Sequence, residues 1–265
     1  MKTQTIAGVL GVAVFGMGMY GAFAMDEREQ QMLYKKHHAK PKVEWGYTGK
    51  IDPSHWGELS SEYALCAGGK NQSPVDLANV TEADLPPIEF NYSSNGKEIL
   101  NNGHSIQVNY AAGSSIVVDG HEFHLLQFHF HSPSENLIDG KSFPMEGHLV
   151  HADENDNLAV VAIMFEEGET NSTIAELWKQ MPGTAGDKQE LNSTISASAL
   201  LPDSKDYYYF NGSLTTPPCT EGVMWMVMEQ PVSISESQVA AFTGVIGHPN
   251  NRPVQPVNAR RILED

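Results

Sequence analysis

Short apolar runs separated by turn-forming residues recur along the chain from residue 45 onward. The segment Ser105–Tyr110 alternates apolar and polar residues, the pattern of a strand with one buried face. Leu158–Phe165 and Val223–Met228 are apolar throughout, which is typical of central strands buried on both faces. This pattern predicts a strand-rich domain with pairing between distant segments.

A hairpin is predicted for residues 115–131, because Asp119-Gly120 supplies the positive φ angles that a tight turn needs. Two short helices are also predicted. One covers about 173–181, and the other starts at Ser235, where Ser235 and Gln238 form a capping box. The prolines of segment 250–260 exclude regular helix and predict an extended closing strand or loop.

The first 24 residues have the features of an export signal. Lys2 precedes an uncharged apolar run, and Ala22-Phe23-Ala24 is a small-x-small cleavage site. We expect cleavage after Ala24, a periplasmic or secreted protein, and no stable membrane span afterwards. An uncleaved anchor stays open, because the uncharged stretch 3–25 is long enough to span a bilayer. Residues 25–44 are polar with mixed charge and are expected to form a tail or spacer, which leaves 45–265 as one domain.

Acidic residues outnumber basic ones, with 33 Asp and Glu against 16 Lys and Arg and a formal net charge of −17. Such a surface repels phosphate backbones and anionic lipids, so no nucleic-acid partner is expected. The two cysteines, Cys66 and Cys219, are expected to form a disulfide, because an exported protein folds in an oxidising compartment. Two free thiols, or a link between subunits, stay open as alternatives.

His129 lies in the apolar run Leu125–Phe130, and His131 directly follows that run. On a strand, Gln127, His129 and His131 share one face, opposite Leu126 and the neighbouring phenylalanines. Polar side chains in such a strand are costly to bury without partners, and a metal ion would satisfy them. A His-x-His pair alone is weak evidence, since hydrogen-bonded histidines facing a polar cavity fit it equally.

A third ligand is available in the sequence FPMEGHLVHAD, where Glu146, His148 and Val150 share a face on a neighbouring strand. Three neutral imidazoles with a fourth position open to water form the usual catalytic zinc site. Gln127 and Glu146 each precede a proposed ligand by two residues and are expected to orient the ligand rings, although the acceptor role of Glu146 is left open.

A series of motifs covers nearly the whole of the chain after residue 44: WGY at 45–47, HW at 55–56, NQSPVD at 71–76, LNNGH at 100–104, QFHFH at 127–131, EGHLVH at 146–151, GSLTTPPC at 212–219 and NRPVQP at 251–256. In this order they resemble an α-class carbonic anhydrase of the exported bacterial type. The resemblance implies a mixed, β-dominated (α+β) fold, with one catalytic domain around a central twisted, mainly antiparallel β-sheet and a few short surface helices. It also implies zinc-dependent, reversible hydration of carbon dioxide to bicarbonate and a proton.

The resemblance implies roles for the residues at its centre. His129, His131 and His148 would hold Zn²⁺, which lowers the pKa of bound water to about 7 and makes hydroxide available. Thr215 would accept a hydrogen bond from the hydroxide and donate its own hydrogen to Glu135. This pair would turn an oxygen lone pair towards carbon dioxide.

Carbon dioxide offers few polar groups to grip, so the resemblance also implies an apolar wall beside the metal. The implied wall consists of Val150, Val160, Leu214 and Trp225. Thr216 would contact bicarbonate or ordered water. Taken singly, each apolar residue of the wall is ordinary core in most proteins.

Proton release is the role that the resemblance implies for His104, because an imidazole titrates near pH 6.5. A surface histidine without a role is the alternative. Asn102 and Gln107, together with Tyr47, would order the water chain.

Two other histidines are interpreted as hydrogen-bonded structural residues. His124 falls on the phenylalanine side of its strand, and His151 on the side away from His148. Ser132-Pro133 and Asn136 replace the Trp-Gly and the His that many relatives carry there. These departures bear on local hydrogen bonds and on rate rather than on the metal.

The expected partners are the small molecules carbon dioxide and bicarbonate, and a homodimer is allowed by analogy with exported bacterial relatives. Two alternative functions stay open: a catalytically silent carbonic-anhydrase-like binding protein, and a metal-assisted esterase. The first usually follows loss of a zinc histidine, and all three are present here. The second needs a wider pocket than Val150 and Leu214 indicate.

Overall fold

The computed structural model of the protein describes residues 27–30, 32 and 43–265. The expected signal segment 1–24 and its cleavage lie outside the described residues. Within the expected spacer, residues 27–30 and 32 are helical, and Gln30 Nε2 donates to the carbonyl oxygen of Leu125 at 2.6 Å. None of the helices in the described part of the chain is long and apolar enough to cross a membrane.

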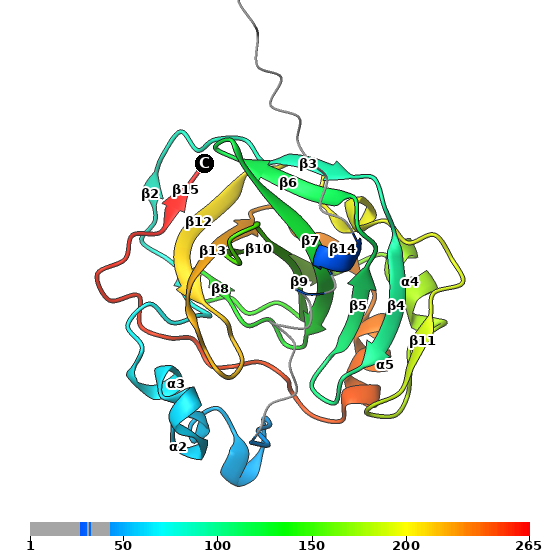
Figure 1. The fold of residues 1–265 in the computed structure, drawn as a ribbon, viewed down its shortest axis with the longest axis horizontal. Coiled ribbons are helices and arrows are strands. Elements are labelled where there is room, and N and C mark those ends of the chain that lie inside the picture. The colour runs from blue at the N-terminus through cyan, green and yellow to red at the C-terminus, as the bar shows by residue number, and fades with distance from the viewer. Residues whose placement is uncertain (1–26, 31, 33–42) are drawn as a thin grey trace, which may run out of the picture.

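In the described residues, one twisted sheet of 13 strands curls around the body of the domain (Figure 1). Its main path runs in the order β11 (Lys188–Glu190), β4 (Gly96–Asn101), β5 (Ile106–Tyr110), β7 (His121–His131), β9 (Met145–Ala152), β10 (Leu158–Glu167), β13 (Glu221–Met228), β12 (Tyr207–Ser213), β15 (Leu263–Glu264) and β2 (Thr81–Glu82). Off this path lie β3 (Glu89–Tyr92), β6 (Ser114–Val118) and β14 (Val232–Ile234). A second sheet pairs β1 (Asp76–Leu77) with β8 (Leu137–Ile138).

Most neighbouring strands are antiparallel, as predicted, but β10 runs parallel to both β13 and β14. The two wholly apolar segments of the sequence form most of β10 and β13, in the middle of the sheet. Residues 158–165 of β10 are all buried. The prediction of central strands is therefore confirmed.

Turn and cap signals in the sequence are also confirmed. Asp119 and Gly120 join β6 to β7 with φ angles of 49° and 74°, the left-handed values that their turn requires. Ser235 and Gln238 form the capping box of α5 (Glu236–Ile246). The other helices are α2 (Trp56–Leu59), α3 (Leu65–Gly68), α4 (Ser172–Trp178), η1 (Gly49–Ile51), η2 (Ser61–Tyr63) and η3 (Ala197–Leu200).

A β-bulge in β7 corrects the predicted alternation of its side chains. The register against β9 shifts between Leu125 and Gln127, so one extra residue enters β7 there. Leu125 packs with Phe128 in the cluster on one face of the sheet, whereas Leu126 packs with the cluster on the other face. The prediction that Leu126 shares the phenylalanine face is therefore wrong. His124 also lies off that face, because both of its neighbours along the strand pack into the phenylalanine cluster.

Apolar side chains fill both faces of the sheet. The larger cluster packs Phe130 and its neighbours against Leu177 of α4 and Phe242 of α5, which lie outside the curled sheet (Figure 1). The second cluster lies on the inner face. A third surrounds the disulfide between Cys66 and Cys219, which is formed as predicted.

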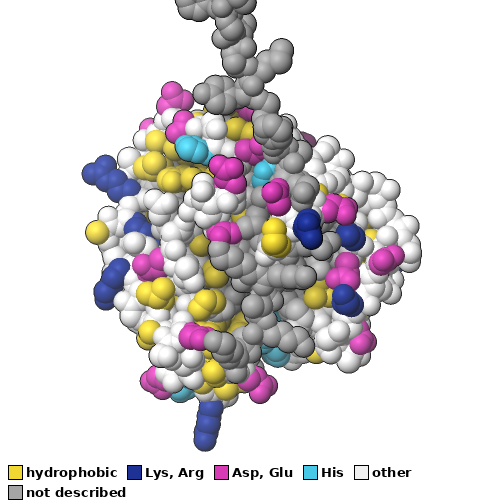
Figure 2. All heavy atoms as spheres, viewed as in Figure 1, with side chains coloured by type: hydrophobic (Ala, Val, Ile, Leu, Met, Phe, Trp, Pro, Cys, Tyr) yellow, Lys and Arg dark blue, Asp and Glu magenta, His cyan; other side chains and the backbone are white. Residues whose placement is uncertain are grey.

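Segment 250–260 contains no regular strand, in agreement with its prolines. Its first residues are nevertheless deeply buried, since Asn250 and Arg252 are at most 1% exposed. Acidic side chains are scattered over the face of the molecule in Figure 2 and do not gather into one patch.

Candidate active site

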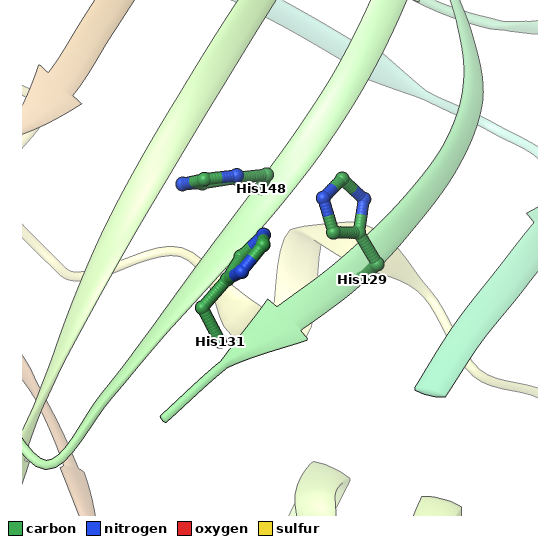
Figure 3. Close-up of side chains that lie close together, drawn as sticks. All are labelled: His129, His131 and His148. Carbon is green, nitrogen blue, oxygen red and sulfur yellow. The ribbon is translucent and has the colours of Figure 1, made fainter. Parts of the chain in front are cut away.

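Three histidines converge on the inner face of the sheet. His129 and His131 project from β7, and His148 projects from β9, where it pairs directly with His129. One nitrogen from each ring lies within 4.8 Å of the others, and Figure 3 shows the three rings around a common space. The strand alternation of β7 and β9 therefore brings the predicted ligands together.

Each ring on β7 has one nitrogen held by an oxygen. Gln127 Oε1 lies 2.9 Å from His129 Nδ1, and the backbone oxygen of Asn250 lies 2.7 Å from His131 Nδ1. An oxygen acceptor at Nδ1 fixes the proton there and leaves Nε2 as the nitrogen that can bind an ion. His131 Nε2 is buried and has no hydrogen-bond partner in the described part of the chain.

The His148 ring on β9 is held through its other nitrogen, Nε2. His148 Nε2 lies 2.9 Å from Glu146 Oε1, so Nδ1 is its candidate ligand atom. The buried Glu146 carboxyl also accepts from the backbone of Glu135 at 2.7 Å, and from the backbone and side chain of Asn136 at 2.8 and 2.7 Å. Asn136 thus serves to hold Glu146. Burial raises the pKa of Glu146, and the hydrogen bonds from Asn136 oppose that shift.

Glu135 lies beside the histidines and is fully buried. Its Oε1 accepts from the backbone N–H of Arg252 at 2.8 Å, and the Thr215 side chain also hydrogen-bonds to the carboxyl. Its Oε2 lies 3.5 Å from His131 Nε2 and 4.0 Å from His148 Nδ1. Burial raises the pKa of Glu135 to about 8, against the opposing effect of its hydrogen bonds.

The donor set fits a divalent metal ion. Burial lowers the pKa of both His131 and His148, so the rings are neutral, the form in which imidazole binds metal. An unpartnered ring nitrogen such as His131 Nε2 is costly to bury, and a cation between the rings would satisfy it. Nitrogen ligands without sulfur favour zinc or another first-row transition ion over calcium or magnesium.

An apolar cluster adjoins the three rings. All four residues of the predicted wall belong to it: Val150, Val160, Leu214 and Trp225. Val160 pairs with Val150 on one side and with Trp225 on the other. The Trp225 ring meets His148 edge-on, with centroids 4.9 Å apart. Leu126 joins this cluster through the β-bulge, which the sequence did not reveal. Thr216, predicted to contact bicarbonate, is half-buried beside Thr215.

His104 is half-buried and stacks on Trp45, with ring centroids 3.8 Å apart and an interplanar angle of 9°. In this position burial lowers the pKa of His104 to about 4, and His248 adds to the shift. Asn102 Oδ1 accepts from the backbone N–H of His104 at 2.9 Å. The Tyr47 ring lies edge-on to His104 at 6.4 Å.

Tyr47 places its hydroxyl group in the interior, where the oxygen has no hydrogen-bond partner from the described residues. Burial raises its pKa well above the usual value, and the nearby Glu135 adds to the shift. Asn102 Nδ2 donates to Gln107 Oε1 at 3.1 Å, so the two predicted proton-path amides are in contact.

Sequence reasoning missed Asn250 and Arg252 as residues of the site. The Asn250 side chain donates to the backbone oxygens of His104 and Phe130 and accepts from Ser132 N–H. These bonds hold the Asn250 carbonyl that His131 uses. The prolines of this segment indicated a packed closing loop, but nothing in the sequence indicated which backbone groups would face the histidines.

Comparisons with known proteins agree with this geometry. The family model described as eukaryotic-type carbonic anhydrase matches residues 51–265. The carbonic anhydrase of Neisseria gonorrhoeae is 51% identical over 221 residues, which cover 83% of this chain and 87% of the relative. That of Pectobacterium carotovorum is 46% identical over 225 residues, covering 85% and 92%. The structure of an α-carbonic anhydrase from Thermovibrio ammonificans with the inhibitor sulfanilamide superposes with a TM-score of 0.83 at 47% identity, covering 84% of this chain and all of that one. The chain belongs to the α-carbonic anhydrase family.

Proposed function

We propose that this protein is a zinc carbonic anhydrase that reversibly hydrates carbon dioxide to bicarbonate and a proton. The observation that carries the proposal is the cluster of three imidazoles, each with one nitrogen held by an oxygen and with one nitrogen from each ring within 4.8 Å of the others. Membership of the α-carbonic anhydrase family supports it.

His129, His131 and His148 would hold the zinc ion. When bound, the ion supplies Lewis acidity that makes a hydroxide nucleophile available near neutral pH. Gln127, Glu146 and the Asn250 carbonyl keep the three rings in position. Such outer partners typically change metal affinity by about 10- to 100-fold when removed.

Thr215 and Glu135 would orient the nucleophile. A charged Glu135 carboxylate only accepts hydrogen bonds, from Arg252 N–H at Oε1 and from the Thr215 hydroxyl. The positive charge of an ion held by the histidines would favour this charged form, against the effect of burial. The Thr215 oxygen then has only lone pairs left, so it accepts the nucleophile's hydrogen and turns a lone pair of the nucleophile towards the carbon atom. The wall of Val150, Val160, Leu214 and Trp225 would hold carbon dioxide there, with Thr216 in contact with bicarbonate or water.

His104 would carry the released proton to solvent. While it stacks on Trp45, its pKa of about 4 makes it a poor proton acceptor near neutrality. The role therefore requires the ring to swing away from Trp45 into a more exposed position, where its pKa returns towards 6.5. Tyr47, Asn102 and Gln107 would order the water between His104 and the reacting centre.

The chain organisation proposed with this function is an export signal at 1–24, a spacer at 25–44 and a catalytic domain at 45–265. The disulfide supports a periplasmic or secreted location, because such bonds persist in oxidising compartments. A homodimer of the mature protein is part of the same proposal, and size-exclusion chromatography with light scattering tests it.

Carbon dioxide hydration by purified residues 25–265 tests the function. We expect one zinc per chain by elemental analysis, activity that chelation removes and zinc restores, and loss of both zinc and activity in His148→Ala. Full zinc occupancy without hydration would instead favour the silent binding protein. Ester hydrolysis without carbon dioxide hydration would favour the esterase.

A further inference from the structure

A chain of hydrogen bonds leads from the proposed proton path to an ion pair at the far edge of the sheet. Asn102 Nδ2 donates to Gln107 Oε1 at 3.1 Å, and Gln107 Nε2 donates to Asn109 Oδ1 at 2.7 Å. Asn109 Nδ2 donates to Glu98 Oε1 at 2.9 Å, and Lys188 Nζ donates to Glu98 Oε2 at 2.8 Å. The chain crosses from β5 to β4 where Asn109 and Glu98 pair, and it ends on β11.

Both ends of the chain impose the same direction on the amides between them. A carboxylate only accepts hydrogen bonds, so Asn109 must turn its NH₂ group to Glu98 and its oxygen to Gln107. At the other end, Asn102 Oδ1 accepts from the backbone N–H groups of His104 and Ser105 at 2.9 and 2.8 Å. Asn102 must therefore offer its NH₂ group to Gln107, and every bond along the chain matches a donor to an acceptor.

We propose that Glu98 is a positioning residue for the known family reaction: with Lys188, its carboxylate fixes the direction of the Asn109–Gln107–Asn102 chain and so the orientation of the proton-path amides. The inference rests on the proposed function of those amides. Gln107 is 3% exposed and pairs with His129 on the adjacent strand, so a change in its amide orientation is felt beside the metal site.

With a neutral amide in place of Glu98, the two ends of the chain would require opposite orientations of the amides between them. Lys188 offers only hydrogens, so Gln at position 98 would turn its oxygen to Lys188 and its NH₂ group to Asn109. Asn109 would then have to rotate, and two donors would face each other before the chain reached Asn102. An unmatched polar group at a buried position costs more free energy than an ordinary hydrogen bond contributes.

Removing the Lys188 ammonium group should remove this mismatch of donors. In a Glu98→Gln/Lys188→Met double variant, the new amide can turn its oxygen to Asn109, and the original direction is restored. A simple loss of charge or of the ion pair predicts the opposite, since the double variant then loses no less than the single one. The rescue therefore separates a directional role from a merely structural one.

The experiment compares the zinc-loaded wild type with Glu98→Gln, Lys188→Met and the double variant. Glu122→Gln is the matched control, because Glu122 also accepts from a neighbouring strand, at 2.7 Å from Ser115 Oγ, but has no link to the chain. We expect kcat of Glu98→Gln to fall roughly three- to tenfold, the effect of about one misplaced hydrogen bond, while kcat/KM stays within about twofold. Added imidazole buffer should restore kcat, and the double variant and Glu122→Gln should match the wild type.

A second readout does not depend on catalysis. The side-chain ¹H–¹⁵N amide resonances of Asn102, Gln107 and Asn109 should shift in Glu98→Gln and return in the double variant. Unchanged resonances and kcat in Glu98→Gln, or a double variant no better than the single one, would overturn the inference. If the wild type failed to hydrate carbon dioxide, the proposed function would be wrong. The resonances would still show whether Glu98 sets the direction of the hydrogen bonds.

Discussion

Arg252 and Glu135 meet through a single hydrogen bond that ties the reacting centre to the disulfide. The backbone N–H of Arg252 donates to Glu135 Oε1 at 2.8 Å, and the guanidinium of the same residue donates to the carbonyl of Cys66, also at 2.8 Å. Arg252 also donates to Gln72, whose Nε2 group donates to the carbonyl of Cys219. Both halves of the disulfide are therefore connected to the carboxyl that is proposed to set Thr215.

Breaking the disulfide should lower both stability and turnover. The bond closes a loop of 153 residues, for which the chain-entropy model gives at most about 5 kcal/mol of stabilisation. We expect Cys66→Ser/Cys219→Ser to unfold at lower urea and to have a lower kcat when assayed well below its thermal midpoint. Unchanged kcat with the bond demonstrably absent would contradict the connection to Glu135.

Glu135→Gln should lower kcat by roughly 10²- to 10³-fold, the usual effect of losing one preorganised group at a reacting centre. The amide keeps an oxygen for Arg252 N–H but presents its NH₂ group to Thr215. The Thr215 oxygen then accepts from residue 135, and its hydroxyl hydrogen points elsewhere. Zinc content should stay at one per chain. Glu229→Gln, which changes a half-buried carboxyl directly after the end of β13, serves as the control and should retain wild-type kcat.

Glu146→Gln should weaken zinc retention about 10- to 100-fold without removing a ligand. The new amide can still offer one oxygen but sets its NH₂ group against the donors of Glu135, Asn136 or His148. Competition with a chromophoric chelator measures the dissociation constant. An affinity equal to that of the wild type would show that Glu146 does not hold His148 in the solution state.

His151 should make the protein sensitive to mild acid. Its ring is buried between Tyr92 Oη at 2.9 Å and the backbone oxygen of Ala159 at 3.3 Å, and burial lowers its pKa to about 3. The unfolded chain binds this proton below about pH 6.5, whereas the folded chain does not until near pH 3. The contribution of His151 is thus complete above about pH 6.5, and stability falls between those values by up to about 1.4 kcal/mol per pH unit.

Urea unfolding at about pH 7, 5.5 and 4.5 measures this dependence. His151→Gln, which cannot titrate, should lose less stability than the wild type over that range. The exposed His121→Gln should follow the wild type. An identical slope for His151→Gln and the wild type would rule out this source of acid sensitivity.

The sequence predicted the elements and the ligand set because both depend on local regularities. Alternation along two strands was enough to bring His129, His131 and His148 to one face, and the wholly apolar segments were enough to identify the central strands. The bulge at Leu125–Gln127 could not be foreseen, since one extra residue in β7 is defined only by its register against β9.

Contacts with distant backbone groups could not be predicted from the sequence either. His131 is oriented by the carbonyl of Asn250, 119 residues away, and a carbonyl carries no side-chain signature in the sequence. The position of His104, which stacks on Trp45 and whose burial lowers its pKa, likewise depends on how the N-terminal part of the domain folds back on the sheet. Residue types indicated the chemistry, whereas these long-range contacts set its geometry.

The two strands that carry the imidazoles are each paired with neighbours on both sides, and their outer nitrogens are already tied down. These strand pairings and hydrogen bonds do not involve an ion, so binding of the ion should need little ordering of the chain. Little of the free energy of coordination is then spent on ordering the chain, so nearly all of it contributes to zinc affinity. The metal-free protein should keep its fold and rebind zinc quickly.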